Sequence, residues 1–240
     1  MFQRLKAKTE EFLGGSVLQP NPKYRMAIGI LGAALPPVLV LLWRAADGVQ
    51  SSISAYYYTG GRDWFVGTLW VVGVFLIFYQ YKPQQPGQAK SQLRHIRSGL
   101  ADASVGKFAG VSAVVVALFP TTPPVGLGNQ PPTIGMAHGV AAFVLFASLS
   151  LFPLLLFSQS RERVRIYKWC GWLMLLFLGL IVAYAFAPDS VRMYLAPWKP
   201  VLVLEWLLIW AFGLSWFAKG REPAANKAPT AHRTEAQAAI

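Results

Sequence analysis

The chain has a single cysteine, Cys170, and only three histidines among its 240 residues. One cysteine excludes an intramolecular disulfide and a metal site built from thiolates. A catalytic zinc site usually takes three protein ligands from His, Asp, Glu or Cys. His95 and His232 lie in polar segments, so His138 is the one histidine within an apolar stretch. We therefore expect neither a bound metal nor a cofactor.

Charged residues are also scarce, at 13% of the chain, whereas 55% of the residues are hydrophobic. The apolar residues gather in six stretches: 26–43, 64–81, 105–120, 134–157, 169–187 and 201–218. Each stretch is close to the ~20 residues that a helix needs to cross a ~30 Å hydrocarbon core. The sequence therefore predicts an all-α polytopic membrane protein, a transmembrane six-helix bundle with no room for a separate soluble domain.

The few charges are unevenly distributed between the segments that join these stretches. With a cytoplasmic N-terminus and six crossings, 18 of the 22 Lys and Arg residues lie on the inner side and four on the outer side. This bias predicts an N-in and C-in multi-pass protein of a bacterial inner (cell) membrane. The basic inner face favours anionic lipid headgroups, at about 1 kcal/mol per basic residue near the surface. We therefore expect membrane lipids rather than nucleic acid as partners.

Three regions follow from this pattern. Residues 1–25 form a cytoplasmic segment whose apolar spacing is compatible with an interfacial helix, residues 26–218 form the transmembrane domain, and residues 219–240 form a disordered tail. Gly106 and Gly110 have the spacing that allows two membrane helices to approach closely. Packing within the bundle is the main interpretation of this spacing, and a homo-oligomer is the minor one.

The most polar outer segment is 50–63, which contains serines, tyrosines and an Arg–Asp pair. Its candidate ligand-binding residues are Ser52, Ser54, Tyr56, Tyr57, Arg62 and Asp63. One interpretation is an ordered cap whose tyrosines lie in the interfacial aromatic belt. The other is that the segment forms one wall of a headgroup or ligand site.

Two further candidates, His138 and Glu205, enter the apolar stretches from the outer side. Glu205 follows Pro200 by five residues, which places it about 7–8 Å into a helix. Ionisable groups within spans usually face the bundle interior and indicate function. If the helices pack suitably, Asp63, His138 and Glu205 share one layer beneath the 50–63 segment.

Three interpretations of this layer are open. His138 and Glu205 could form a hydrogen-bonded pair that only fixes packing. The layer could bind a polar headgroup or small amphiphile, with Arg62 as the anion partner. It could also be catalytic, with His138 as base, Ser52 or Ser54 as nucleophile and an acid as orienting group.

The motif Ile53-Ser54-Ala55-Tyr56 before Arg62-Asp63, together with Phe119-Pro120 and His138, resembles a group of small six-span bacterial and archaeal membrane proteins of unknown function. That group is distantly similar to the damage-regulated autophagy modulator and Sfk-type membrane proteins of eukaryotes. The resemblance covers about residues 26–218 and implies a six-helix bundle. Its eukaryotic relatives are linked to lipid organisation or membrane trafficking.

The chain is also similar to seven-span hydrolases of the alkaline ceramidase type, but it lacks their histidine set and one span. The function we predict is therefore a non-enzymatic interaction with lipid or a small amphiphile in a polar pocket on the extracytoplasmic side. A membrane-embedded hydrolase using the same residues is the alternative. A transporter is a third option, and it would require a continuous polar path from the outer layer to Asp102.

Overall fold

The computed structural model describes residues 22–79, 92–124, 126–159 and 163–222, and their regular structure is entirely helical. The early elements are α2 (Pro22–Asp47), a short 3₁₀ helix η1 (Ser54–Tyr58), α3 (Arg62–Phe78), α4 (Gln92–Leu118) and α5 (Pro132–Leu151). They are followed by the π-helical segment η3 (Phe152–Leu156), η4 (Phe157–Gln159), α6 (Val164–Ala185), α7 (Asp189–Leu195), η5 (Ala196–Trp198) and α8 (Pro200–Gly220).

Within the part of the chain that the structure describes, four helical segments are long and apolar enough to cross a membrane: α2, α5 with its π-helical extension, α6 and α8. With 17 residues, α3 is about 26 Å long, slightly less than the ~30 Å core. The strongly apolar part of α4 is Ser104–Leu118. The prediction of an all-α membrane protein is confirmed, whereas the number of crossings stays a prediction.

The outward faces of these helices also suit lipid better than water. Phe108, Val140, Trp172 and Leu214 are each more than half exposed, and they belong to four different helices. Apolar surface of this extent is rare on soluble proteins and marks contact with a membrane or a partner.

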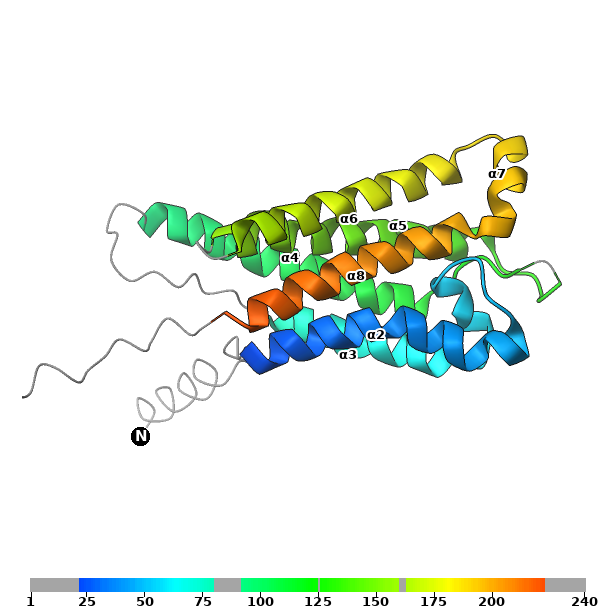
Figure 1. The fold of residues 1–240 in the computed structure, drawn as a ribbon, viewed down its shortest axis with the longest axis horizontal. Coiled ribbons are helices and arrows are strands. Elements are labelled where there is room, and N and C mark those ends of the chain that lie inside the picture. Colours follow the sequence, from blue (N-terminus) through cyan, green and yellow to red (C-terminus); the bar gives the residue numbers. More distant parts are fainter. Residues whose placement is uncertain (1–21, 80–91, 125, 160–162, 223–240) are drawn as a thin grey trace, which may run out of the picture.

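The long helices form a ring in which each packs against its neighbours in sequence. The ring is α2–α3–α4–α5–α6–α8, and it is closed by α8, which packs against α2 (Figure 1). The seven-residue helix α7 lies across one end of the bundle and joins α6 to the start of α8 (Figure 1). The interior is filled by side chains such as Leu39, Leu76, Phe152, Met174 and Leu208.

Glycines allow close backbone contacts between α2 and α8 and between α3 and α4. A Cβ atom added to Gly29 on α2 would lie 2.7 Å from the carbonyl oxygen of Gly213 on α8. On α4, a Cβ atom at Gly110 would lie 2.5 Å from the carbonyl oxygen of Gly73 on α3. Since lipid provides no hydrophobic force between helices, such close backbone contacts contribute much of the packing energy. The Gly106 and Gly110 spacing therefore serves packing within the bundle.

Two helices extend beyond the apolar stretches 26–43 and 201–218. α2 already begins at Pro22, and α8 continues through Lys219 to Gly220. The predicted interfacial helix within residues 1–21 and the predicted tail beyond residue 222 lie outside the described residues.

Gly110→Ala should destabilise the protein by about 1–3 kcal/mol, because its Cβ atom would force α3 and α4 apart. Gly67→Ala is the control on α3, because no atom lies within 4 Å of its added Cβ. It should leave stability unchanged or raise it slightly. Thermal unfolding of both variants in detergent measures the difference, and equal midpoints would contradict the packing role.

Candidate functional site

The segment between α2 and α3 is held against the start of α8. The Leu202 N–H donates to the carbonyl oxygen of Ser51 at 3.0 Å, and the Lys199 ammonium group donates to the carbonyl oxygen of Val49. The first N–H groups of a helix have no partner within the helix. Pairing Leu202 with Ser51 satisfies one of them and fixes the segment over the end of α8.

Glu205 makes the innermost of these links. Its Oε2 accepts a hydrogen bond of 2.6 Å from the backbone N–H of Ile53, and only 8% of the residue is exposed. A carboxyl group in such apolar surroundings is costly unless it is hydrogen-bonded. The bond also satisfies a buried backbone donor immediately before η1, so Glu205 positions the whole 3₁₀ helix.

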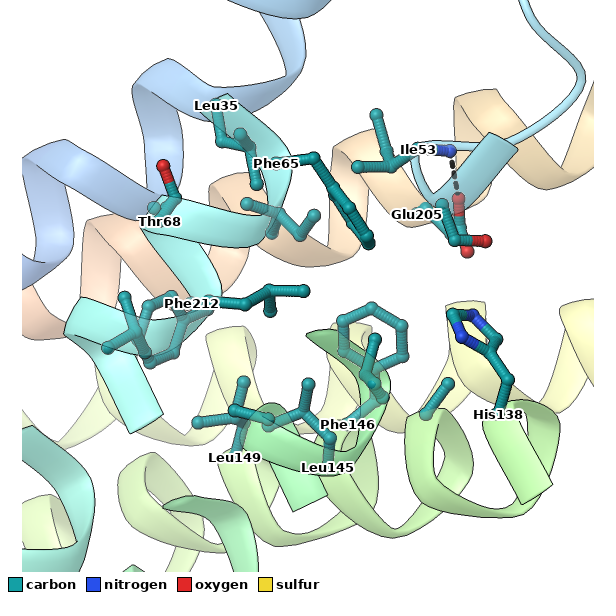
Figure 2. A pocket seen from close by; sticks show the side chains of 18 residues that line it. Leu35, Ile53, Phe65, Thr68, His138, Leu145, Phe146, Leu149, Glu205 and Phe212 are labelled. Atoms are coloured by element: carbon teal, nitrogen blue, oxygen red, sulfur yellow. Dashed lines mark hydrogen bonds between the residues drawn. The ribbon is translucent and has the colours of Figure 1, made fainter. Parts of the chain in front are cut away.

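His138 lies on the facing side of the bundle, on α5, and is 4% exposed. Its Nδ1 is 2.7 Å from the carbonyl oxygen of Phe119. A carbonyl oxygen can only accept, so Nδ1 carries the proton, and in the neutral ring Nε2 carries a lone pair. The imidazole reaches from α5 toward the carboxyl group of Glu205 (Figure 2), but no hydrogen bond joins these two described side chains.

Two cavities meet at this pair. The first, of about 70 Å³, lies inside the ring and is lined mainly by apolar side chains of α2, α3, α5 and α8, including Leu35, Phe65 and Leu145 (Figure 2). The second is a groove of about 580 Å³ between α5, α6 and the start of α8. His138 and Glu205 line both, so they lie at the junction of the two.

The groove extends from this junction to the lipid-facing surface. Met136 and Val140 of α5 line it and are each more than 60% exposed, and Phe186 at the end of α6 is 86% exposed. Ile181 and Val182 continue its apolar wall along α6. The groove therefore has a polar inner end and an apolar path that opens sideways between α5 and α6.

The two candidate serines belong to the polar end. Ser52 and Ser54 line the groove, and their Oγ atoms lie 3.3 Å apart. The Oγ of Ser52 also accepts a hydrogen bond of 3.1 Å from the N–H of Ala55. Neither hydroxyl is hydrogen-bonded to His138 in the described part of the chain.

The remaining candidates lie outside both cavities. Tyr56 is fully buried, and its hydroxyl oxygen accepts a 3.5 Å hydrogen bond from the N–H of Gln50. Arg62 stacks 4.6 Å from the ring centre of Tyr57 and donates to its hydroxyl at 2.9 Å. Asp63 is exposed and borders a separate shallow depression on α3. The structure thus brings together Ser52, Ser54, His138 and Glu205, but it does not bring Asp63 into their layer.

A family model described as "Protein of unknown function (DUF998)" matches residues 26–222. The chain belongs to this family. Its members are uncharacterised, so the match supports a membrane protein of unknown function and assigns no role to the site. Searches of the curated proteins and of the solved structures found no match.

Several hydrogen-bonding groups at the candidate site of this DUF998 protein are not apparent from the sequence. The Ile53 N–H and the Phe119 carbonyl are backbone atoms, which no residue pattern identifies. Tyr58 donates to the carbonyl oxygen of Thr121 at 2.6 Å and lies 3.0 Å from Oε1 of Gln130, which ties η1 to the next outer loop. Burial raises the pKa of the Tyr58 hydroxyl above its usual value, so it stays a donor at neutral pH.

A second polar cluster lies at the opposite end of the bundle. Lys219 and Glu222 form an ion pair at 2.5 Å with both side chains about 95% buried, and the Tyr167 hydroxyl donates to Glu222. Arg25 donates to the hydroxyl of Tyr79 at 3.0 Å. The aromatic ring of Trp216 packs at the centre of this end. These polar groups are mutually paired, which is typical of buried charges that hold a structure together.

The site shows no arrangement for metal binding. Within the described ranges, no three His, Cys, Asp or Glu side chains come together as a metal site. The chemistry that the site offers is hydrogen bonding from a carboxyl group, an imidazole and two hydroxyls at the end of an apolar groove.

Glu205→Leu should lower the free energy of unfolding by about 1–3 kcal/mol, because it leaves the buried Ile53 N–H without an acceptor. Glu205→Gln keeps an amide oxygen that accepts the same bond and should stay close to the wild type. Thermal unfolding in detergent compares the two variants. Equal losses in both would show that charge, and not the bond to Ile53, matters at this position.

Proposed function

We propose that this protein binds a lipid or another small amphiphile in the groove between α5, α6 and α8, without catalysing a reaction on it. The observation that carries the proposal is the position of His138 and Glu205 at the closed end of a groove whose other end opens toward lipid. A molecule could enter sideways from the bilayer and place its polar end against these two side chains.

The lining of the groove matches an amphiphile along its length. The apolar walls are built from Phe143, Phe146 and Leu178, whereas Ser52 and Ser54 lie with the ionisable pair at the polar end. A volume of about 580 Å³ falls within the roughly 300–1,000 Å³ of ordinary small-molecule sites.

The proposal includes an orientation. We place six crossings in a bacterial inner membrane, with both termini cytoplasmic and the groove in the extracytoplasmic half. In support, Lys23, Arg165 and Lys168 lie at the end of the bundle where α2 begins and α8 ends, away from α7 (Figure 1). This basic end would lie against anionic headgroups of the inner leaflet.

A hydrolase is the alternative, and one observation favours it. The His138 tautomer leaves Nε2 free of a proton, which a general base requires. Against it, the hydroxyls of Ser52 and Ser54 are turned to each other and to the backbone. A transporter has less support, because the central cavity is lined mainly by apolar side chains such as Leu35 and Val72.

The orientation predicts which positions react from outside the cell. A cysteine at Asn129, which is exposed in the loop before α5, should react with a membrane-impermeant maleimide on intact cells. A cysteine at Arg165, which is exposed at the start of α6, should react only after the membrane is permeabilised. The native Cys170 is 4% exposed and should give little background. The reverse pattern would overturn the proposed orientation.

Blocking the groove should displace the ligand without unfolding the protein. Gly139 lines the groove, and no atom lies within 4 Å of a Cβ added there, so Gly139→Leu should fill it. Gly179→Leu is the matched control, because Gly179 on α6 is equally open and does not line the groove.

The readout is lipid extraction and mass spectrometry of the purified proteins. Gly139→Leu should lose a co-purifying amphiphile by about tenfold, while Gly179→Leu retains it and both unfold at the same temperature. Equal amphiphile content in both variants would remove the groove as the binding site.

A further inference from the structure

We infer that the ligand of this groove carries a hydrogen-bond-donating headgroup, a hydroxyl or an amine, on one apolar chain, and that phosphate and carboxylate headgroups are rejected. The inference rests on the proposed function and specifies the chemistry of the ligand. It follows from the hydrogen-bonding groups at the closed end of the groove.

The first acceptor is Nε2 of His138. Because Nδ1–H donates to the carbonyl oxygen of Phe119, the neutral imidazole turns an atom with a lone pair toward the groove. No other hydrogen bond to this ring is found from a side chain in the described ranges. A ligand that donates a hydrogen bond satisfies Nε2. A headgroup that can only accept hydrogen bonds would place its own lone pair against the lone pair of Nε2.

The second acceptor is the carboxyl group of Glu205. One oxygen, Oε2, is occupied by the Ile53 N–H, and Oε1 forms no hydrogen bond with the rest of the described chain. Figure 2 shows this carboxyl group and the His138 ring turned toward each other across the end of the cavity. An amino group between them could donate to both acceptors, whereas a hydroxyl could donate to one of them.

The charges around the groove exclude an anionic headgroup. No Lys or Arg occurs among the described residues that line the groove or the cavity beside it. Arg62, the sequence-based candidate for an anion partner, is held on the ring of Tyr57 outside both cavities. A phosphate or carboxylate placed at this end would meet the Glu205 carboxyl group with no cation to offset it.

The lining of the groove argues for one apolar chain on this headgroup. From Glu205 and His138 the lining changes at once to apolar residues of α5 and α6, ending at the exposed Val140 and Phe186. A long-chain alcohol, a monoacylglycerol or a long-chain amine fits this order of polar and apolar contacts. A double-chain phospholipid does not match it at the polar end.

The test uses four probes with the same C18 chain: oleyl alcohol, oleylamine, methyl oleate and oleyl phosphate. The purified full-length protein in detergent is titrated with each probe, and binding is measured by native mass spectrometry. Oleyl alcohol or oleylamine should bind about tenfold more tightly than methyl oleate, the size expected for one or two net hydrogen bonds. Oleyl phosphate should bind most weakly.

Glu205→Gln provides a variant that keeps the fold. Its amide oxygen accepts the Ile53 N–H, which turns the amide NH₂ group, a donor, toward the groove. The preference for oleylamine over methyl oleate should then shrink to about twofold or less, because the amine loses one of its two acceptors and the ester carbonyl can accept from the new NH₂ group.

The outcomes separate this inference from the proposed function. Equal binding of the alcohol and the ester, both lost in Gly139→Leu, would keep the groove as the site and overturn the donor headgroup. Preference for oleyl phosphate would overturn it as well. If the wild type binds none of the four probes above the level of Gly139→Leu, the proposed function fails and this inference fails with it.

Discussion

The hydrogen bond between the Ile53 amide and the Glu205 carboxyl group is the interaction on which the outer half of the protein depends. It joins two buried residues that lie 152 positions apart in the sequence. It fixes η1, and η1 in turn carries Ser54 to the groove and Tyr58 to the loop after α4. One carboxyl group thus serves both the fold and the candidate site, as is common for ionisable groups in membranes.

The two ends of the bundle differ in how their polar groups are arranged. At the end near Arg25 and Lys219, charged groups pair with each other and aromatic rings pack around Trp216. At the other end, α7 separates α6 from the start of α8 (Figure 1), and the space between these helices and α5 stays open as the groove. The close glycine contacts of α2 with α8 and of α3 with α4 belong to helix pairs that do not surround the groove.

Hydropathy and charge were sufficient to predict an all-α membrane protein, because lipid requires long apolar helices and their period is local in sequence. The rule that buried ionisable groups face the interior also selected His138 and Glu205. It could not select their partners, which are backbone atoms of Phe119 and Ile53.

Asp63 was grouped with His138 and Glu205 because depth along a helix can be counted from sequence, whereas the direction around the helix axis depends on packing. The ion pair of Lys219 with Glu222 was hidden for a similar reason, since a polar stretch after an apolar run has the composition of a tail.

The closure of the ring by its first and last long helices has a consequence for biogenesis. α2 and the segment after it leave the ribosome early, yet their partners Gly213, Leu202 and Glu205 all belong to α8. Until α8 enters the bilayer, the Ile53 amide and one face of α2 have no partner in the nascent chain. The outer segment can therefore mature only after α8 has been synthesised, and chains arrested before α8 would present an unfinished surface to the quality-control proteases of the membrane.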